Sequence, residues 1–216
     1  MMLIDFHSHT LPHADHGCKD EETFLFQLAE AKKNGIGTII ATPHFYPHRD
    51  HVDEFLKRRD RGIGITAGKT DGIDFIVGAE VQLCIGLDNM KGIEKLCIGE
   101  SDIMLIELPS MTISNEFYET LSRLKKRFRI VIAHVDRCEK SVTDKLIEQG
   151  YMLQLGADCF TPYNYFRIKR ILKSGQVYAL GSDIHGKSLR AYPRLVRAHK
   201  MSDGVNTRMR RLIYGE

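Results

Sequence analysis

The chain has 216 residues, of which 43% are hydrophobic and 27% are charged, and its formal net charge is +3. This length is enough to bury one sizeable core, so we expect a single domain over residues 1–216. The charge is small and scattered, which argues against a nucleic-acid partner, because a nucleic-acid face needs clustered Lys and Arg.

The five cysteines are odd in number and include no Cys-x-x-Cys pair. This pattern argues against a disulfide framework and favours a reducing compartment. The apolar stretch at the N-terminus is short and has no basic start, so it resembles neither a signal peptide nor a membrane span. We therefore expect a cytoplasmic protein without a membrane span.

Residues 3–9 form the first predicted strand, a short apolar run that ends in His7 and His9. Alternate side chains of an extended chain lie on one face, so the two imidazoles point the same way and can share one metal ion. Two histidines at this spacing are more often ordinary surface residues. The hypothesis of a metal site therefore depends on what stands at the ends of the later strands.

Strands and helices alternate along the rest of the chain. Short apolar runs predict the later strands, at residues 38–42, 75–77, 103–106, 130–133, 151–155 and 177–180. Helical spacing of apolar residues, with cap and stop residues, predicts helices at residues 20–35, 117–128, 141–150, from 161 onward, and 191–214.

Three segments need separate predictions. Between residues 45 and 74 we predict a short helix near Val52 and Phe55, then a loop over 61–72, which contains four glycines. A weak helix is predicted near residues 92–99. Ser141 and Asp144 are predicted to form a capping box.

Continuous apolar strands that alternate with helices indicate a parallel sheet covered on both faces. About seven such units in this length fit an α/β fold of the barrel type, a small, distorted (β/α)7 barrel. An open doubly wound sheet is the alternative. In either fold the active site lies at the C-terminal ends of the strands.

Titratable side chains stand at the ends of nearly all the predicted strands, and the sixth strand alone has no obvious ligand. They are His7, His9, His44, Glu80, Glu107, His134, Asp183 and His185, and the first loop adds His13, Asp15 and His16. Each one alone is more often a hydrogen-bonded rim or core residue. Gathering all of them in one pocket is costly without a counter-charge, so we interpret the set as a metal site.

The types of ligand limit the metal. Imidazoles and carboxylates without thiolates suit Zn²⁺, Mn²⁺ or Fe. The number of ligands implies two or three ions that share a bridging carboxylate. Clustered ions of this kind hydrolyse phosphate esters.

The motifs D-F-H-S-H, T-P-H, G-A-E, L-I-E, I-A-H and S-D-I-H together resemble the polymerase and histidinol phosphatase (PHP) superfamily. Within it, the chain is similar to the capsule-associated, manganese-dependent protein-tyrosine phosphatases of bacteria. The shared motifs run in the family's order from Asp5 to about Arg190, nearly the whole chain. The resemblance implies a trinuclear site on a seven-stranded distorted barrel.

The resemblance also implies a ligand set for each ion. The first ion would take His7, His9, Glu80 and Asp183; the second, Glu80, Glu107 and His134; the third, His44, His185 and a first-loop residue. That loop residue matches His16, with Asp15 as the rival.

Two arginines match the family's pattern, Arg137 after the fifth strand and Arg190 after the last. A guanidinium can bind two phosphate oxygens at once, whereas the plain interpretation of each arginine is a surface salt bridge. Asp15 and Asp136 are candidates for a proton donor. His48 and His51 are predicted to be exposed loop residues.

The predicted reaction is hydrolysis of a phosphomonoester by a hydroxide that bridges two metal ions, with Mn²⁺ preferred and Fe or Zn²⁺ as alternatives. By resemblance, the substrate is a phosphotyrosine protein, an autophosphorylating tyrosine kinase that controls capsule or exopolysaccharide export. The segment between His44 and Glu80 is shorter than the family's and rich in glycine, which makes the substrate the least secure part of this prediction.

Other functions stay open. Histidinol phosphatase would use the same fold and metals on a small alkyl phosphate. A metallo-amidohydrolase would need a lysine at a middle strand end, and a cysteine phosphatase would need Cys-x5-Arg; neither is present. A non-catalytic metal-binding module is the alternative of another class, although all nine ligand positions are filled.

Overall fold

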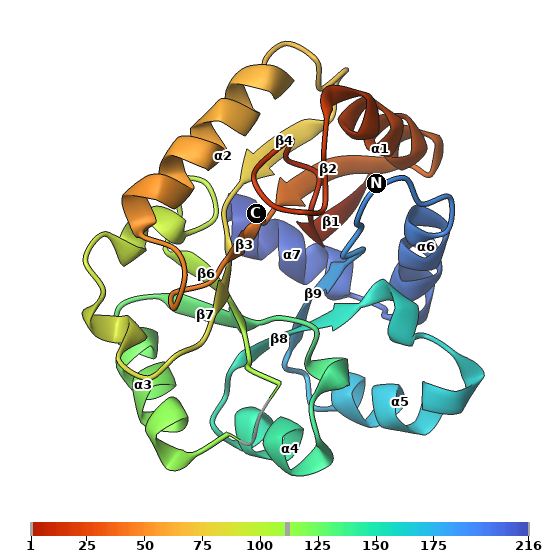
Figure 1. The fold of residues 1–216 in the computed structure, drawn as a ribbon. Helices are drawn as coiled ribbons and strands as arrows, with labels where there is room; N and C mark the ends of the chain where they lie inside the picture. Colours follow the sequence, from red (N-terminus) through yellow and green to blue (C-terminus); the bar gives the residue numbers. More distant parts are fainter. Residues whose placement is uncertain (1, 111–112, 216) are drawn as a thin grey trace.

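The computed structural model describes residues 2–110 and 113–215 (Figure 1). Its main strands are β1 (Leu3–Ser8), β2 (Ile36–Ala41), β4 (Asp74–Val77), β6 (Ile103–Glu107), β7 (Arg129–Ile132), β8 (Met152–Gly156) and β9 (Val177–Gly181). Each of the seven predicted strands is therefore present. Two short strands, β3 (His44–Phe45) and β5 (Glu80–Gln82), follow β2 and β4 after breaks of two residues each.

The strands pair in parallel and follow chain order around a barrel. One sheet has the order β1-β2-β4 and the other β3-β5-β6-β7-β8-β9. The breaks after β2 and β4 divide what would be one sheet into two. The chain beyond β9 closes the ring against β1, because Asp183 N donates to His7 O at 2.9 Å and His9 N donates to Ile184 O at 3.2 Å. The predicted distorted barrel is confirmed, and the open sheet is not formed.

The helices lie around the strands (Figure 1). They are α1 (Glu21–Lys33), α2 (Val52–Thr66), α3 (Asn115–Lys125), α4 (Lys140–Glu148), α5 (Tyr165–Lys173), α6 (Ala191–Met201) and α7 (Val205–Tyr214). The start of α1 follows the sequence closely, since Asp20 accepts from Thr23 N at 2.8 Å and two glutamates occupy the first turn.

Helix α7 covers the N-terminal end of the barrel. Arg208 donates to Val177 O at the start of β9, and Tyr214 bonds to Thr38 and to Asp74 at the start of β4. Arg129, at the start of β7, donates to Leu212 O. This end is therefore occupied by the chain itself, and the C-terminal strand ends are left for a site.

The prediction of a loop over residues 61–72 is wrong for the first half of this segment. Helix α2 continues to Thr66, and its Gly62 lies against Leu11, where an added Cβ would be 2.7 Å from the Leu11 side chain. The glycine in this helix serves close packing and does not end the helix. Packing against the first loop outweighs the low helix propensity of glycine.

The predicted capping box is also wrong. Helix α4 begins at Lys140, its N-cap is Glu139, and Ser141 lies inside it. Asp144 accepts instead from Lys140 at 2.9 Å and pairs with Arg170 of α5. The carboxylate is therefore used between side chains and not at the helix end.

The remaining predicted helices differ in detail. The C-terminal helical tail is two helices, α6 and α7, separated at residues 202–204, where Gly204 has a φ of 75°. Residues Ile93–Leu96 and Pro162–Asn164 form short 3-10 turns, and the second leads into α5. Within residues 2–110 and 113–215, the helices are too short or too polar for any of them to cross a lipid bilayer.

Candidate metal centre

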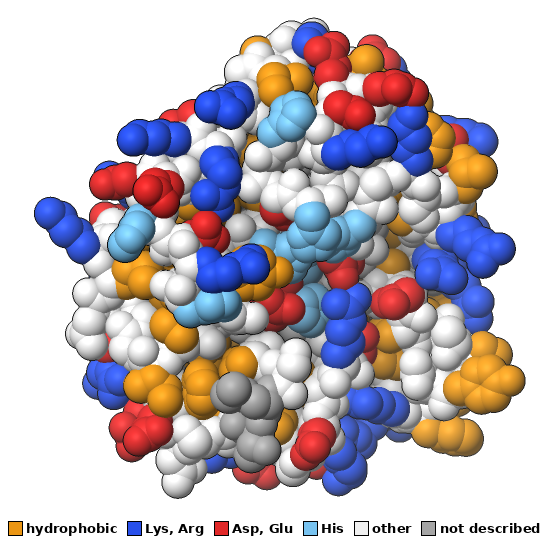
Figure 2. All heavy atoms as spheres, viewed as in Figure 1, with side chains coloured by type: hydrophobic (Ala, Val, Ile, Leu, Met, Phe, Trp, Pro, Cys, Tyr) orange, Lys and Arg blue, Asp and Glu red, His pale blue; other side chains and the backbone are white. Residues whose placement is uncertain are grey.

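The candidate ligands meet at the C-terminal ends of the strands. Figure 2 shows histidine and acidic side chains gathered in the middle of this face, with Lys and Arg beside them. His7 belongs to β1 and His9 follows it; His44 begins β3, Glu80 begins β5, and Glu107 ends β6. His134 follows β7, and Asp183 and His185 follow β9. The barrel therefore brings together ligands that are widely separated in sequence.

A fully buried carboxylate, Glu80, lies at the centre of the cluster. Its Oε2 is 3.3 Å from Nε2 of both His7 and His9, and 2.9 Å from Nδ1 of His44. Its Oε1 is 2.8 Å from Nε2 of His134. One carboxylate thus faces imidazoles from three parts of the barrel, which is the position a bridging ligand would take.

Asp183 and Glu107 flank this centre on two sides. Asp183 Oδ1 is 3.2 Å from His9 Nε2 and 3.6 Å from His185 Nδ1. Glu107 Oε1 is 3.6 Å from His134 Nε2 on the other side. The three carboxylates together give the cluster the negative charge that divalent cations need.

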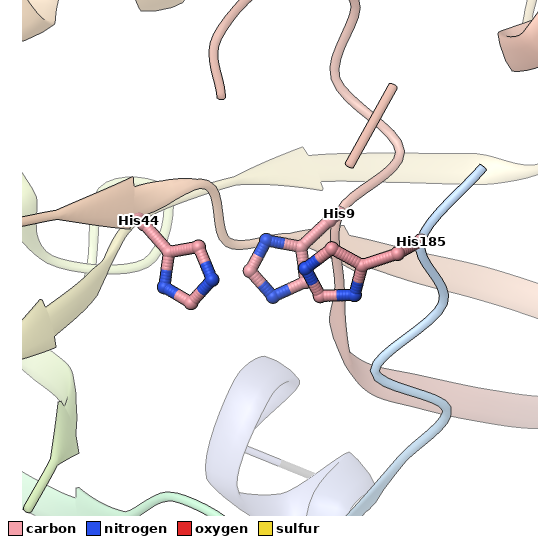
Figure 3. A group of neighbouring side chains, drawn as sticks. All are labelled: His9, His44 and His185. Carbon is pink, nitrogen blue, oxygen red and sulfur yellow. The ribbon is translucent and has the colours of Figure 1, made fainter. Parts of the chain in front are cut away.

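Three imidazoles, from His9, His44 and His185, form a second group within the cluster (Figure 3). One nitrogen from each lies within 4.8 Å of the others. The same limit holds for His7, His9 and Glu80, and for His44, Glu80 and Glu107. These groups share members, so they form one continuous set of donor atoms with room for more than one ion.

The donor atoms fit metal ions better than they fit each other. Oε2 of Glu80 and Nδ1 of His44 are buried and 2.9 Å apart, yet neither makes a hydrogen bond of acceptable geometry. Unsatisfied buried polar atoms are costly, and a cation bound between them would remove that cost. Imidazole and carboxylate donors without thiolates also match Mn²⁺, Fe or Zn²⁺.

The pKa values of the cluster show strong coupling between charges. Burial alone would raise the pKa of Glu80, but His7, His134 and His44 hold it well below its usual range. Burial would lower the pKa of His9, yet the neighbouring carboxylates of Asp15, Asp183 and Glu80 raise it well above the ordinary value. The raised pKa of His9 means that a proton and a metal ion would compete for its ring nitrogen.

The comparison with known families decides where the chain belongs. Residues 3–211 match the profile of a family described as capsular polysaccharide synthesis, CpsB/CapC. The chain is a member of the CpsB/CapC family. The resemblance inferred from its motifs is thereby confirmed.

Two relatives match this CpsB/CapC chain over most of its length at low sequence identity. Tyrosine-protein phosphatase CpsB of Streptococcus pneumoniae is 27% identical over 206 residues, covering 85% of this chain and 83% of that protein. Tyrosine-protein phosphatase YwqE of Bacillus subtilis (strain 168) is 24% identical over 209 residues, covering 88% of this chain and 80% of that protein.

Solved structures share the fold. A chain from the crystal structures of YwqE from Bacillus subtilis and CpsB from Streptococcus pneumoniae, described as unique metal-dependent tyrosine phosphatases, matches with a TM-score of 0.74. It is 22% identical, and the match covers 95% of this chain and 90% of that one. A putative histidinol phosphatase from Listeria monocytogenes matches with a TM-score of 0.51 at 12% identity, covering 85% and 96%.

Asp15, the rival of His16 in the first loop, is engaged in hydrogen bonds. Its Oδ2 lies 2.6 Å from His9 Nδ1 and accepts from His44 N at 2.9 Å, and its Oδ1 accepts from Gly17 N at 2.8 Å. Burial would raise its pKa, but the bond to His9 holds the pKa well below its usual range. This arrangement favours Asp15 as a residue that orients His9, and it disfavours Asp15 as a proton donor.

The His16 ring stands over the group of three imidazoles. Its centroid is 5.2 Å from that of His44, with the planes at 8°, and 4.8 Å from that of His185. His16 is exposed, as are the loop histidines His13, His48 and His51. Among these four described residues, His16 is the one whose ring contacts imidazoles of the cluster.

The sixth predicted strand, β8, contributes a residue that the sequence reasoning missed. Gln154 Oε1 accepts from His134 N at 2.5 Å and lies 3.3 Å from His7 Nδ1. A proton on Nδ1 of His7 leaves the lone pair of its Nε2, which faces Glu80, available to a metal ion. The only signal in the sequence is a polar residue within an apolar strand.

Asp5 is a second residue that was missed. It is fully buried, and it accepts from Ser182 N at 2.8 Å and from Ser182 Oγ at 2.6 Å. These bonds hold the segment that carries Asp183 and His185 against β1. Burial raises the pKa of Asp5 to about 6, although the bonds from Ser182 oppose this shift.

The backbone at the site is unusual in two ways. His134 and Asp183 have positive φ values of 29° and 50°, which are uncommon for residues other than glycine and are typical of functional sites. Gly17 and Gly181 lie so close to β1 that an added Cβ would be 2.1 Å from His9 Cβ and 2.5 Å from His7 Cβ, respectively. Both glycines are required for this close approach.

The two predicted arginines differ in position. Arg137, just after His134, donates to Asp183 Oδ2 at 2.6 Å and so contacts a candidate ligand directly. Arg190 is exposed and immediately precedes α6. Asp136, the other candidate proton donor, accepts from Gly156 N at 2.7 Å, and burial raises its pKa.

Proposed function

We propose that this chain is a metal-dependent protein-tyrosine phosphatase. The observation that carries the proposal is the buried Glu80, which faces four imidazoles at 3.3 Å or less. Membership in the CpsB/CapC family supports the choice of phosphotyrosine, because relatives over most of this chain are named tyrosine-protein phosphatases.

The proposed ligands hold two or three divalent ions, with Mn²⁺ preferred. His7, His9, Glu80 and Asp183 would hold the first, Glu80, Glu107 and His134 the second, and His16, His44 and His185 the third. When bound, the ions supply Lewis-acid charge for the phosphate oxygens and lower the pKa of a water molecule. Shared contacts of Glu80, His9 and His44 support such a cluster.

The proposed reaction is hydrolysis of the phosphate ester, and side chains of the protein assist it. A water oxygen adds to phosphorus, the bond from phosphorus to the tyrosine oxygen breaks, and the products are inorganic phosphate and tyrosine. Tyrosine has a pKa of about 10, so its phenolate leaves without strong general acid catalysis. Arg137 and Arg190 are proposed to neutralise phosphate charge, and Asp15 to hold the His9 ring in place.

The proposed partner is a phosphotyrosine protein, an autophosphorylating bacterial tyrosine kinase of capsule or exopolysaccharide synthesis. The family's description as a capsular polysaccharide synthesis family supports this choice. The cytoplasm is the proposed location, because all five cysteines are free thiols, as expected in a reducing compartment.

Phosphate release from a phosphotyrosine peptide and from histidinol phosphate, measured side by side, tests the proposal. Each substrate is assayed with Mn²⁺ and with a chelator. We expect the peptide to be preferred and its turnover to disappear with the chelator. Preference for histidinol phosphate would keep the metal site and overturn the substrate, while no turnover of either would favour a metal-binding module.

The His134→Ala variant tests the site itself. We expect a loss of activity of at least about 100-fold, because the variant removes a proposed ligand that contacts Glu80. His51→Ala, at an exposed position, is the matched control and should keep full activity. Bound manganese and thermal unfolding are measured for both variants, so that loss of a ligand is separated from loss of the fold.

A further inference from the structure

A small cavity opens beside the candidate metal centre. Its volume is about 150 Å³, and Asp183 and His185 form the part of its wall that belongs to the centre. The other walls come from the 3-10 turn Ala157–Cys159, from Arg137, and from the start of α6 with the segment before it. A group bound here would therefore lie next to a substrate phosphate at the metals.

Two arginines line this cavity, and their surroundings differ. Arg137 is bonded to Asp183 and also lies near Asp158, so its guanidinium already has carboxylate partners. Arg194 is exposed on α6, and within residues 2–110 and 113–215 its guanidinium forms no hydrogen bond or ion pair. Arg194 is thus the cation of this cavity that is free to bind an anion.

The position of Arg194 was not expected from the sequence. Motif spacing points to Arg190, but the residues of this region that line the cavity are Ser188, Ala191 and Arg194. Arg194 lies one helical turn after Arg190, and its backbone N donates to Arg190 O. Arg194, and not Arg190, is therefore the arginine of this region that lines the cavity next to Asp183.

We propose that Arg194 determines specificity by binding the carboxylate of an acidic residue that flanks the phosphotyrosine. This inference rests on the proposed function and deepens it. A planar guanidinium binds two carboxylate oxygens at once, and a cavity of about 150 Å³ holds a short side chain. With the phosphate at the metal centre, an adjacent carboxylate reaches the neighbouring cavity.

The test compares two phosphotyrosine peptides that differ only in the flanking residues, Glu in one and Gln in the other. The ratio of kcat/KM for the two peptides is measured with Mn²⁺ for the full chain and its variants. We expect the unmodified chain to prefer the Glu peptide by roughly tenfold, as a charge-assisted hydrogen bond of about 1.4 kcal/mol would give. The preference should appear mainly in KM and should weaken with salt.

Variants of α6 assign the preference to one residue. Arg194→Ala should bring the ratio close to one, and Arg194→Glu should reverse it in favour of the Gln peptide. Arg197→Ala and Arg197→Glu are matched controls, since Arg197 is exposed on the same helix and does not line the cavity. Both controls should keep the ratio of the unmodified chain.

The outcomes separate this inference from the proposed function. If the unmodified chain hydrolyses both peptides equally well, or if Arg194→Ala keeps the preference, the function stands and the role of Arg194 is overturned. An equal loss on both peptides in Arg194→Ala would place the residue on the phosphate and would also overturn it. If the unmodified chain hydrolyses neither peptide, the proposed function fails and this inference fails with it.

Discussion

At the scale of single residues, the candidate centre depends on side chains that orient its ligands. Asp15 holds His9 at 2.6 Å, and Gln154 contacts both His7 and the backbone of His134. Groups that orient a ligating ring matter for metal binding nearly as much as the ligands themselves. They set the tautomer of the ring and the direction in which its donor atom points. Loss of such a residue should therefore weaken metal binding without removing a ligand.

Replacing Gln154 tests this role directly. Gln154→Leu removes the acceptor for His134 N and the partner of His7 Nδ1. We expect Mn²⁺ affinity, measured by calorimetry, to fall by about 10- to 100-fold, and stability to fall by about 1–3 kcal/mol. Gln149→Leu, at the exposed end of α4, is the control and should change neither quantity. Unchanged Mn²⁺ affinity in Gln154→Leu would contradict the orienting role.

The gathering of the candidate ligands at one end of the barrel could be predicted from the sequence, whereas the contacts of Gln154 and Asp5 could not. His7, Glu80 and His134 stand at recognisable strand ends, so order along the chain was sufficient to select them. Gln154 and Asp5 act through contacts with β1 and with the turns after β7 and β9, which depend on which strands become neighbours. That information arises only when the barrel closes.

At the scale of elements, glycines shape the site more through packing than through flexibility. The prediction of a loop at residues 61–72 treated Gly62 as a helix breaker. Gly62 instead lies inside the long helix α2, and the absence of a side chain there makes space for Leu11 of the first loop. Gly17 makes space for His9 in the same way. A sequence pattern records that a glycine is present, and only the packing shows why.

Gly17→Ala should disturb the metal centre through this contact. The new Cβ would meet His9 Cβ at 2.1 Å, so the first loop or the His9 ring must move. We expect a destabilisation of about 1–3 kcal/mol, typical of overpacking, together with weaker Mn²⁺ binding. Chemical denaturation and calorimetry measure the two effects.

Gly64→Ala is the control for this substitution. Gly64 lies in α2, and an added Cβ there has nothing within 4 Å. Helix propensity alone predicts that this variant is more stable, by up to about 1 kcal/mol. If Gly17→Ala were as stable and bound Mn²⁺ as tightly as Gly64→Ala, the close approach of Gly17 to His9 would contribute neither to stability nor to metal binding.

At the scale of the whole molecule, the two ends of the barrel have different tasks. Helix α7 closes the N-terminal end through bonds to the first residues of β4 and β9, while the opposite end gathers the titratable cluster. The alternation of strands and helices along the sequence predicted this barrel. It also predicted that the candidate site would lie at the C-terminal ends of the strands. The division into two sheets could not be predicted, because it results from short breaks at residues 42–43 and 78–79, where strand pairing is interrupted.

The cluster also couples metal binding to pH and to the stability of the whole fold. In the metal-free protein the raised pKa of His9 gives stability below the unfolded pKa of about 6.5, and this stability is lost as the pH rises through the folded pKa. The lowered pKa of Glu80 gives stability above about pH 4.3, which is lost in acid. A metal ion needs His9 neutral and Glu80 ionised, so rising pH favours the ion over the proton.

Removal of the metal should therefore destabilise the fold more at higher pH. With Mn²⁺ at 100 times its Kd, the fold should gain about 2.7 kcal/mol over the chelated protein at pH 8, or a Tm higher by about 5–10 °C. At pH 6 the gain should be clearly smaller, because protons compete for the same nitrogen atoms. Calorimetric scans at both pH values, with Mn²⁺ and with chelator, measure the difference. A gain that is equal at pH 6 and pH 8 would mean that Mn²⁺ binds outside the histidine cluster, since only ligands that titrate in this range make the stabilisation depend on pH.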